Sequence, residues 1–167
     1  GEQWLLSLDS LVSQGDILHT AETYTPYTHQ AVQLRRANKI KKLVCTCWET
    51  IPHNNEIFAR LRQWKKEAYQ YVDIFHTPTE RAKEALIKEG VNPNKIKVIN
   101  YGVNLNHFKP PTKRATSYNP IVLTVARRVP EKGVDIWNQL RQEFGSCIDF
   151  RWVDSLPYKE VIKEYQK

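Results

Sequence analysis

The chain has 167 residues, of which 41% are hydrophobic and 26% are charged, and its formal net charge is +7. This length suits one domain or parts of two, and the composition excludes a disordered tail. The absence of any apolar run of about 18 or more residues excludes a membrane-spanning helix, and the excess of basic residues favours anionic partners.

Short apolar runs alternate with helical runs along the chain, which predicts βαβ units and a parallel sheet. In the first part of the chain, strands are expected at residues 16–20, 42–47, 72–77 and 95–99. Helices are expected at residues 28–37, 55–71 and 80–89. We expect Thr79 to cap the last of these helices and Gly90 to stop it.

The helix predicted at residues 55–71 is amphipathic and basic. Its apolar face has residues at steps of three and four: Ile57, Leu61, Trp64, Ala68 and Val72. Its opposite face is mostly basic: Arg60, Arg62, Lys66 and Glu67. Such a helix packs on a sheet or lies on a membrane surface, and we favour packing on the sheet.

Residues 108–119 contain two prolines and several charges, which is typical of a linker. After them a strand is expected at residues 120–126, a helix from about Gly133, and another strand near residues 148–153. We therefore expect part of one domain at residues 1–107, a linker at 108–119, and the start of a second domain at 120–167.

Three cysteines, Cys45, Cys47 and Cys147, form no disulfide framework and favour reduced thiols in the cytoplasm. The Cys-x-Cys pair near His53 has two interpretations, a metal site or small buried residues on a strand. The second interpretation is favoured, because zinc signatures need a further, well-spaced pair of ligands.

Polar residues stand at or after the ends of the first two predicted strands. His19 stands near the end of the first strand and Glu22 after it, and Glu49 and His53 follow the second strand. In a parallel sheet, the loops at the carboxyl ends of strands carry ligands. Each of these four residues is therefore either a ligand contact or an ordinary loop residue.

The strongest local signal is the basic loop from Val125 to Gly133, which follows a strand and leads into a helix. Arg127 and Lys132 lie five residues apart across this loop, so both cations can converge on one site. The N–H groups of the nearby helix N-terminus also favour anions. The pattern predicts either a diphosphate site or a solvated basic loop with Glu131 as a counter-charge.

This loop resembles the G-R-x-x-x-x-K-G loop of family-4 glycosyltransferases, with Ala126 in place of the leading Gly. Residues 73–110 resemble the passage that closes the acceptor-side domain of that family: strand, Pro-Ser, helix, Gly-Val, Lys-Ile, Asn-Gly-Val-Asp, Phe-x-Pro. Thr79, Tyr101 and Asn104 stand where Ser, Asn and Asp are usual. Two ordered motifs are far more specific than either one alone.

The resemblance implies an α/β fold with two Rossmann-like domains (GT-B), both incomplete in this chain. Family members bind a nucleotide sugar between the domains and transfer the sugar with retention of configuration, usually without a metal ion. Arg127 and Lys132 match the two cations that hold the donor diphosphate. Many members have a His where this chain has Trp48, which leaves four candidates for sugar or acceptor contacts: Glu49, His53, His19 and Glu22.

Two parts of the family pattern are not found, a glycine-rich loop near the start and a later pair of glutamates. We therefore expect a fragment with little activity of its own that still carries the diphosphate cations. No catalytic residue is assigned, and no cofactor or metal ion is expected. The acceptor is expected to be a glycan, a lipid or a small molecule, and the location is expected to be the cytoplasm, with peripheral membrane contact as an option.

Two other kinds of function remain open. A GT-B epimerase or phosphorylase would share the fold, although the Arg-x4-Lys-Gly loop fits the transferases better. A non-catalytic module could use its basic helices to bind a membrane surface or nucleic acid. Since no nucleic-acid recognition motif occurs, we do not expect nucleic acid as a partner.

Overall fold

The computed structural model describes residues 3–110 and 119–166, and the chain divides into two compact units, residues 1–101 and 102–167. The first unit contains α1 (Leu8–Leu11), β1 (Ile17–Ala21), α2 (Pro26–Arg36), β2 (Lys42–Thr46), α3 (Ala59–Tyr71), β3 (Ile74–Thr77), α4 (Glu80–Lys88), the 3-10 turn η1 (Pro93–Lys95) and β4 (Ile96–Val98). The second unit contains β5 (Ile121–Val125), the 3-10 turn η2 (Pro130–Lys132), α5 (Val134–Phe144), β6 (Asp149–Val153) and α6 (Tyr158–Tyr165). None of the helices in these described ranges is long and apolar enough to cross a membrane.

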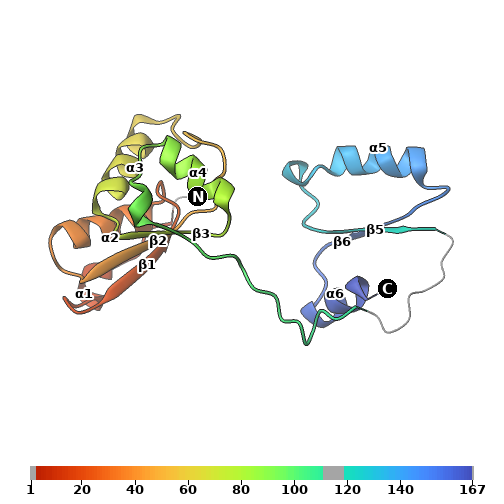
Figure 1. The fold of residues 1–167 in the computed structure, drawn as a ribbon, viewed down its shortest axis with the longest axis horizontal. Coiled ribbons are helices and arrows are strands. Elements are labelled where there is room, and N and C mark those ends of the chain that lie inside the picture. The colour runs from red at the N-terminus through yellow and green to blue at the C-terminus, as the bar shows by residue number, and fades with distance from the viewer. Residues whose placement is uncertain (1–2, 111–118, 167) are drawn as a thin grey trace. The chain divides into compact units, whose positions relative to one another are not determined.

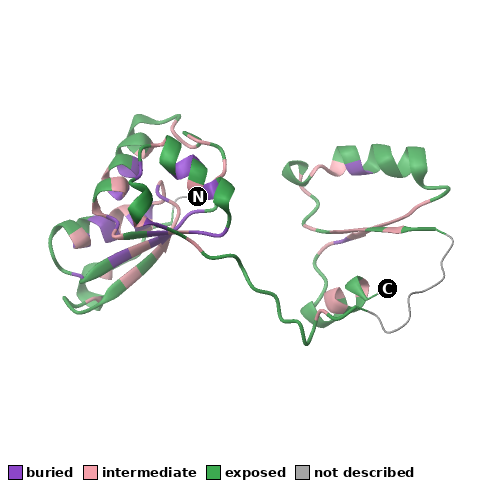
Figure 2. Ribbon diagram, viewed as in Figure 1, coloured by how far each residue is buried: buried purple, intermediate pink, exposed green. Residues whose placement is uncertain are grey.

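The first unit is a four-stranded parallel sheet in the order β1-β2-β3-β4, with α2, α3 and α4 on one face (Figure 1). Alternate residues of a strand point to opposite faces, so Leu43 and Cys45 enter the core under these helices while Val44 and Thr46 face the other way. Figure 2 shows that burial is concentrated between the sheet and the helices. The opposite face is more open, and Ile17 on it is 61% exposed.

Local signals in the sequence correctly predicted most of this unit, including its α/β class and its parallel sheet. The Thr79 hydroxyl caps α4 by accepting a hydrogen bond from the Ala82 N–H at 3.1 Å. Gly90 follows α4 with a φ of 95°, the left-handed conformation that ends helices. Cys45 and Cys47 are buried free thiols, as the interpretation of small strand residues required.

The start of α3 corrects one prediction. The helix expected from residue 55 begins at Ala59 instead, because His53 and Asn55 have φ values of 62° and 61° and the chain turns there. Ile57, expected on the apolar helix face, precedes the helix and is 87% exposed. Lys65, a charged residue of the same helix, is buried.

The second unit has β5 and β6 as a parallel pair, with α5 on one side of the strands and α6 on the other (Figure 1). Trp137 of α5 is buried and packs edge-on against Phe150 and Trp152 of β6, with ring centroids 5.9 and 5.4 Å apart. The linker expected at residues 108–119 stays a prediction, since residues 111–118 lie outside the described ranges.

Candidate functional site

A pocket of about 400 Å³ lies at the carboxyl ends of β1, β2 and β3 in the first unit. Its lining combines aromatic rings with a few polar groups: His19, Thr20, Ala21, Tyr27, Thr46, Trp48, His76 and Tyr101. Small-molecule sites have this size and this composition. Of the four residues that the sequence nominated in this unit, His19 lines the pocket.

Three strands contribute to a chain of hydrogen bonds across this pocket. His19 Nε2 lies 2.7 Å from Thr46 Oγ1, and the same oxygen lies 2.9 Å from His76 Nδ1. His76 Nε2 lies 2.9 Å from the carbonyl oxygen of Ile99. The parallel register, which pairs Thr46 with His76, brings these side chains together on one face of the sheet.

Trp48 and Tyr101 form one wall of the pocket. The Trp48 indole N–H donates a hydrogen bond to the Tyr101 hydroxyl, and the Tyr101 ring stands edge-on to His76 at 6.1 Å. Trp48 and Tyr101 are also positions at which the chain departs from the family pattern, which usually has His and Asn there. The two departures therefore contact each other in the structure.

Glu22 lies beside the pocket and supports its edge. Its Oε1 accepts a hydrogen bond from the Trp48 N–H at 2.8 Å. Burial raises the pKa of Glu22 above its usual value, although this hydrogen bond opposes the rise. The carboxylate thus holds the start of the loop that carries Trp48.

Glu49 is used within its own loop. Its Oε1 accepts the N–H groups of Thr50 and Ile51, both at 3.0 Å. Its Oε2 accepts the side-chain amides of Asn54 and Asn55 at 2.6 and 3.3 Å. Glu49 therefore shapes residues 49–55, and it is not among the residues that line the pocket with His19.

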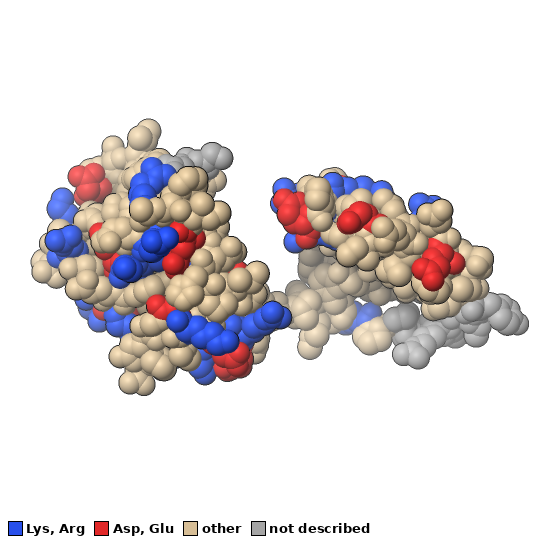
Figure 3. Space-filling model, turned by 90° about the horizontal axis from the view of Figure 1, so that it is seen from above, with Lys and Arg blue, Asp and Glu red and all other residues tan. Residues whose placement is uncertain are grey.

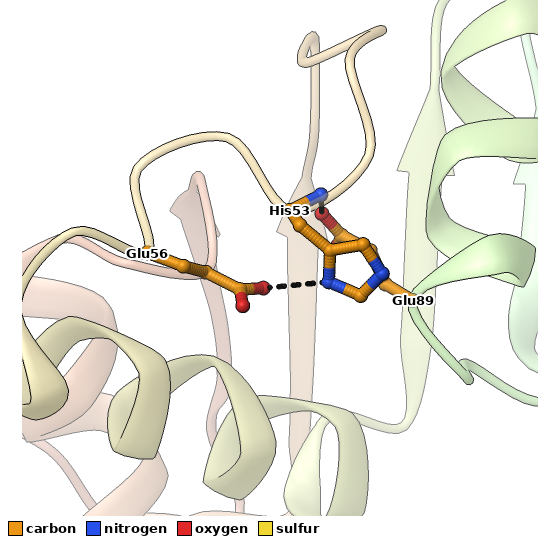
Figure 4. A group of neighbouring side chains, drawn as sticks. All are labelled: His53, Glu56 and Glu89. Carbon is orange, nitrogen blue, oxygen red and sulfur yellow. Dashed lines mark hydrogen bonds and ion pairs between the residues drawn. The ribbon is translucent and has the colours of Figure 1, made fainter.

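His53 belongs to a group of ligand-type side chains on the far side of this loop. The candidate ligand atoms of His53, Glu56 and Glu89 lie within 4.8 Å of one another (Figure 4). The buried Lys65 ammonium also contacts the carboxylates, at 3.1 Å from Glu56 Oε1 and 2.7 Å from Glu89 Oε1. A metal ion would have to replace this ammonium. Cys45 does not belong to the group, which gives the metal interpretation of the Cys-x-Cys pair no support among the described residues.

The basic loop of the second unit follows β5. Arg127 and Lys132 are exposed on either side of the start of η2, and Gly133, with a φ of 70°, turns the chain into α5. Within residues 3–110 and 119–166 neither cation forms a salt bridge. The pKa of Asp154 is lowered, first by its hydrogen bonds with Ser155 and the Arg128 N–H and then by the charges of Arg128 and Arg127.

Arg128 has a different role from its neighbour. Its guanidinium lies over the rings of Trp137 and Trp152, at 5.9 and 5.6 Å from their centroids. Among the described residues, Arg127 and Lys132 have no such ring contacts. Their convergence on one ligand stays a prediction.

Thr46, His76 and Tyr27 also line the pocket but were not predicted as site residues from the sequence. Thr46 and His76 lie within predicted strands. Alternation along parallel strands would have indicated that both face the same side of the sheet as His19.

Comparisons with known proteins give a family and a fold. The family model described as Glycosyltransferase Family 4 matches residues 3–107, and no curated protein matches the chain. The crystal structure of Anabaena Alr3699/HepE in complex with UDP is similar, with a TM-score of 0.61 and 14% identity over 84% of this chain and 49% of that one. The apo form of the lipopolysaccharide outer core galactosyltransferase WaaB has a TM-score of 0.53 and 16% identity over 90% of this chain and 48% of that one.

The chain thus spans about half the length of these two structures. At such identities the likeness concerns the fold alone. It confirms the α/β fold of the GT-B type that the sequence predicted.

Proposed function

Because the chain belongs to glycosyltransferase family 4, we propose that it forms part of an enzyme that moves a sugar from a nucleotide-sugar donor onto an acceptor. The observation that carries this proposal is the order of features along the chain. The family match over residues 3–107 is followed by β5 and then by the exposed Arg127 and Lys132. The solved complex of HepE with UDP supports a nucleoside diphosphate as the ligand.

In this proposal the basic loop holds the donor diphosphate. As the bond between sugar and phosphate breaks, negative charge grows on the distal phosphate, and fixed cations at Arg127 and Lys132 stabilise it. Gly133 directs the chain into α5, so the N–H groups of the first turn of this helix lie next to the loop and favour the same anion. The proposal includes transfer of the sugar with retention of its anomeric configuration and without a metal ion.

The acceptor side of the proposal is the pocket of the first unit. A glycan, lipid or small-molecule acceptor held there would be oriented for reaction, which is catalysis by positioning. Glu22, Glu49 and His53 act in this proposal through the loops that they hold. We place the protein in the cytoplasm, in agreement with its three free cysteines, and expect the 167-residue chain to bind ligands without efficient transfer.

Calorimetry tests the donor site directly. UDP, GDP and ADP, followed by their nucleotide sugars, are titrated into the chain and into the double variant Arg127→Ala/Lys132→Ala. Loss of two charge-assisted hydrogen bonds should weaken binding about a hundredfold or more. The double variant Lys159→Ala/Lys163→Ala removes the same charge from exposed positions of α6 and should retain the affinity. Equal weakening in both variants would contradict a specific donor site.

Peripheral membrane contact is a second candidate function, favoured by one exposed segment. Ile57 and Phe58 are 87% and 66% exposed and directly precede the exposed Arg60 and Arg62 of α3. An apolar tip beside arginines suits an anionic lipid surface. Sedimentation with phosphatidylglycerol vesicles, but not with phosphatidylcholine vesicles, is expected, and Ile57→Ser/Phe58→Ser should abolish it. On the face shown in Figure 3, Asp and Glu side chains lie among the Lys and Arg side chains.

A further inference from the structure

The orientation of His76 is determined by a backbone carbonyl group. The carbonyl oxygen of Ile99 can only accept a hydrogen bond, so the proton of the neutral His76 ring is on Nε2, 2.9 Å away. His76 Nδ1 is then an acceptor. The Thr46 hydroxyl, 2.9 Å from this nitrogen, donates its proton to it.

The direction of the hydrogen bond between Thr46 and His76 also determines the direction of the one between Thr46 and His19. Because its own proton is directed at His76, Thr46 Oγ1 accepts a hydrogen bond from His19 Nε2–H across 2.7 Å. The neutral His19 ring then has a bare Nδ1. Among the described residues this nitrogen has no hydrogen-bond partner, and His19 is exposed on the pocket. The chain of bonds therefore fixes one tautomer of His19 and presents an acceptor to a ligand.

The walls of the pocket suit a neutral, hydroxyl-bearing ring. The described residues that line it include no Lys, Arg, Asp or Glu, so the site offers no charge for an ionic ligand. Trp48 and Tyr101 are 45% and 62% exposed, and their rings provide apolar surface against which a ring can pack. The volume of about 400 Å³ is within the range of small-molecule sites.

We propose that this pocket binds a neutral sugar ring and that His19 Nδ1 accepts a hydrogen bond from one of its hydroxyl groups. Thr46 and His76 are positioning residues, which hold the His19 ring in the required tautomer. This inference rests on the proposed function for one point, that the ring belongs to the sugar acceptor. The binding chemistry itself follows from the first unit alone.

NMR spectroscopy of the 167-residue chain tests both parts. Long-range ¹H–¹⁵N spectra of the imidazole groups should show protonated Nε2 and bare Nδ1 for His19 and His76. Titration with glucose, galactose and N-acetylglucosamine should change the chemical shifts of the Trp48 indole N–H and of the His19 ring for at least one sugar. Absence of these shifts for all three sugars, or a proton on Nδ1 of the neutral His19, would overturn the inference.

Variants with a matched control separate positioning from folding. Thr46→Val removes the relay hydroxyl and should weaken sugar binding about tenfold while His19 loses its single tautomer. Thr46→Ser retains a hydroxyl and should restore both properties. Thr77→Val makes the same change on β3, at a buried hydroxyl that has no hydrogen-bond partner among the described residues, and should alter neither. Equal effects of Thr46→Val and Thr77→Val would refute the relay.

A change at the exposed wall avoids the core altogether. Tyr101→Ala should weaken binding up to about tenfold through loss of ring contact. UDP binding, measured on the same samples, distinguishes the two proposals. If sugars change the Trp48 chemical shift and UDP does not bind, the sugar-binding proposal is supported and the donor-site proposal is refuted. If UDP binds and no sugar changes the chemical shifts, only the sugar-binding proposal is refuted.

Discussion

Lys65→Met removes the cation from the cluster that holds the loop between β2 and α3. The Lys65 side chain is 2% exposed, and its ammonium lies 2.7 Å from Glu89 Oε1 and 3.1 Å from Glu56 Oε1. The Glu89 side chain is 4% exposed and also accepts from the Tyr69 hydroxyl at 2.6 Å and from the His53 N–H at 2.7 Å. Methionine has a similar shape but no charge, so the substitution leaves a buried carboxylate without its cation.

Loss of one partner from a buried ion pair costs about 3–5 kcal/mol. The Glu56 side chain is 18% exposed, and water compensates part of its loss, so we expect the lower end, about 3 kcal/mol. The double variant Lys65→Met/Glu89→Gln removes both charges. It should therefore be less destabilised than the sum of the single variants, with a coupling of about 2 kcal/mol.

Urea unfolding followed through amide resonances of β2 and β3 measures the stability of the first unit by itself. Lys66→Met is the matched control, since Lys66 is the exposed neighbour on the same helix and its loss should change stability by less than about 0.5 kcal/mol. If the free energies of unfolding of Lys65→Met and Lys66→Met agreed within about 0.5 kcal/mol, the reasoning would be refuted.

The cluster also predicts a dependence on pH. Burial raises the pKa of Glu56, but hydrogen bonds with Lys65 and His53 outweigh it, so the pKa lies below the usual value. A carboxyl with a lowered pKa in the folded state stabilises the protein above its unfolded pKa of about 4.3, and this stabilisation is lost as the pH falls further. The loss on acidification should be smaller in Lys65→Met.

Three further outcomes are expected. Asp73→Asn should cost about 2 kcal/mol in urea unfolding, because Asp73 accepts from Arg35 Nε at 2.8 Å and the Leu43 N–H at 2.9 Å. Burial raises the pKa of Asp73, but these hydrogen bonds lower it by more, so the net pKa lies below its usual value. The stabilisation from Asp73 is therefore present above pH about 4 and is lost below it. Thr79→Ala should lower stability by about 1 kcal/mol through loss of the α4 cap, and Thr79→Ser should not. EDTA should leave UDP affinity in calorimetry unchanged, because the proposed donor site uses side-chain cations.

Most of the longer elements of the first unit could be predicted because each has a strong local signal, whereas the short α1 and η1 were not predicted. β2 combines an apolar run with buried cysteines, and α4 has Thr79 and Gly90 at its ends. Signals of this kind depend on a few neighbouring residues. They are therefore visible in the sequence without knowledge of the rest of the fold.

The start of α3 and the burial of Lys65 could not be predicted in this way. Ile57 continues the helical spacing, but the carboxylate of Glu49 gathers the residues before it into a turn. Lys65 has the surroundings of a surface lysine in the sequence. Its partner Glu89 is 24 residues away, and only the packing of α3 beside the end of α4 brings the two together.

The residues of the pocket could be predicted only in part, because they come from different strands that are neighbours in the sheet and not in the sequence. His19 lies near the end of its strand and was predicted as a site residue, whereas Thr46 and His76, which also lie within strands, were not. The register pairs Thr46 with His76 and His19 with Val44, two residues before Thr46 on the same face. Parallel strands thus convert three separate polar residues into one connected group. Predicting such a group requires the order and register of the strands, which are set by the packing of the whole unit.

For the same reason, Trp48 and Tyr101 look in the sequence like unrelated departures from the family pattern. They are 53 residues apart in the chain, yet the indole N–H of one donates to the hydroxyl of the other. Each residue replaces a smaller one, and the two large side chains support each other at the ends of neighbouring loops. A ligand ring packed against this wall contacts both at once. We therefore expect these two positions to determine sugar specificity jointly, through a surface that neither residue forms alone.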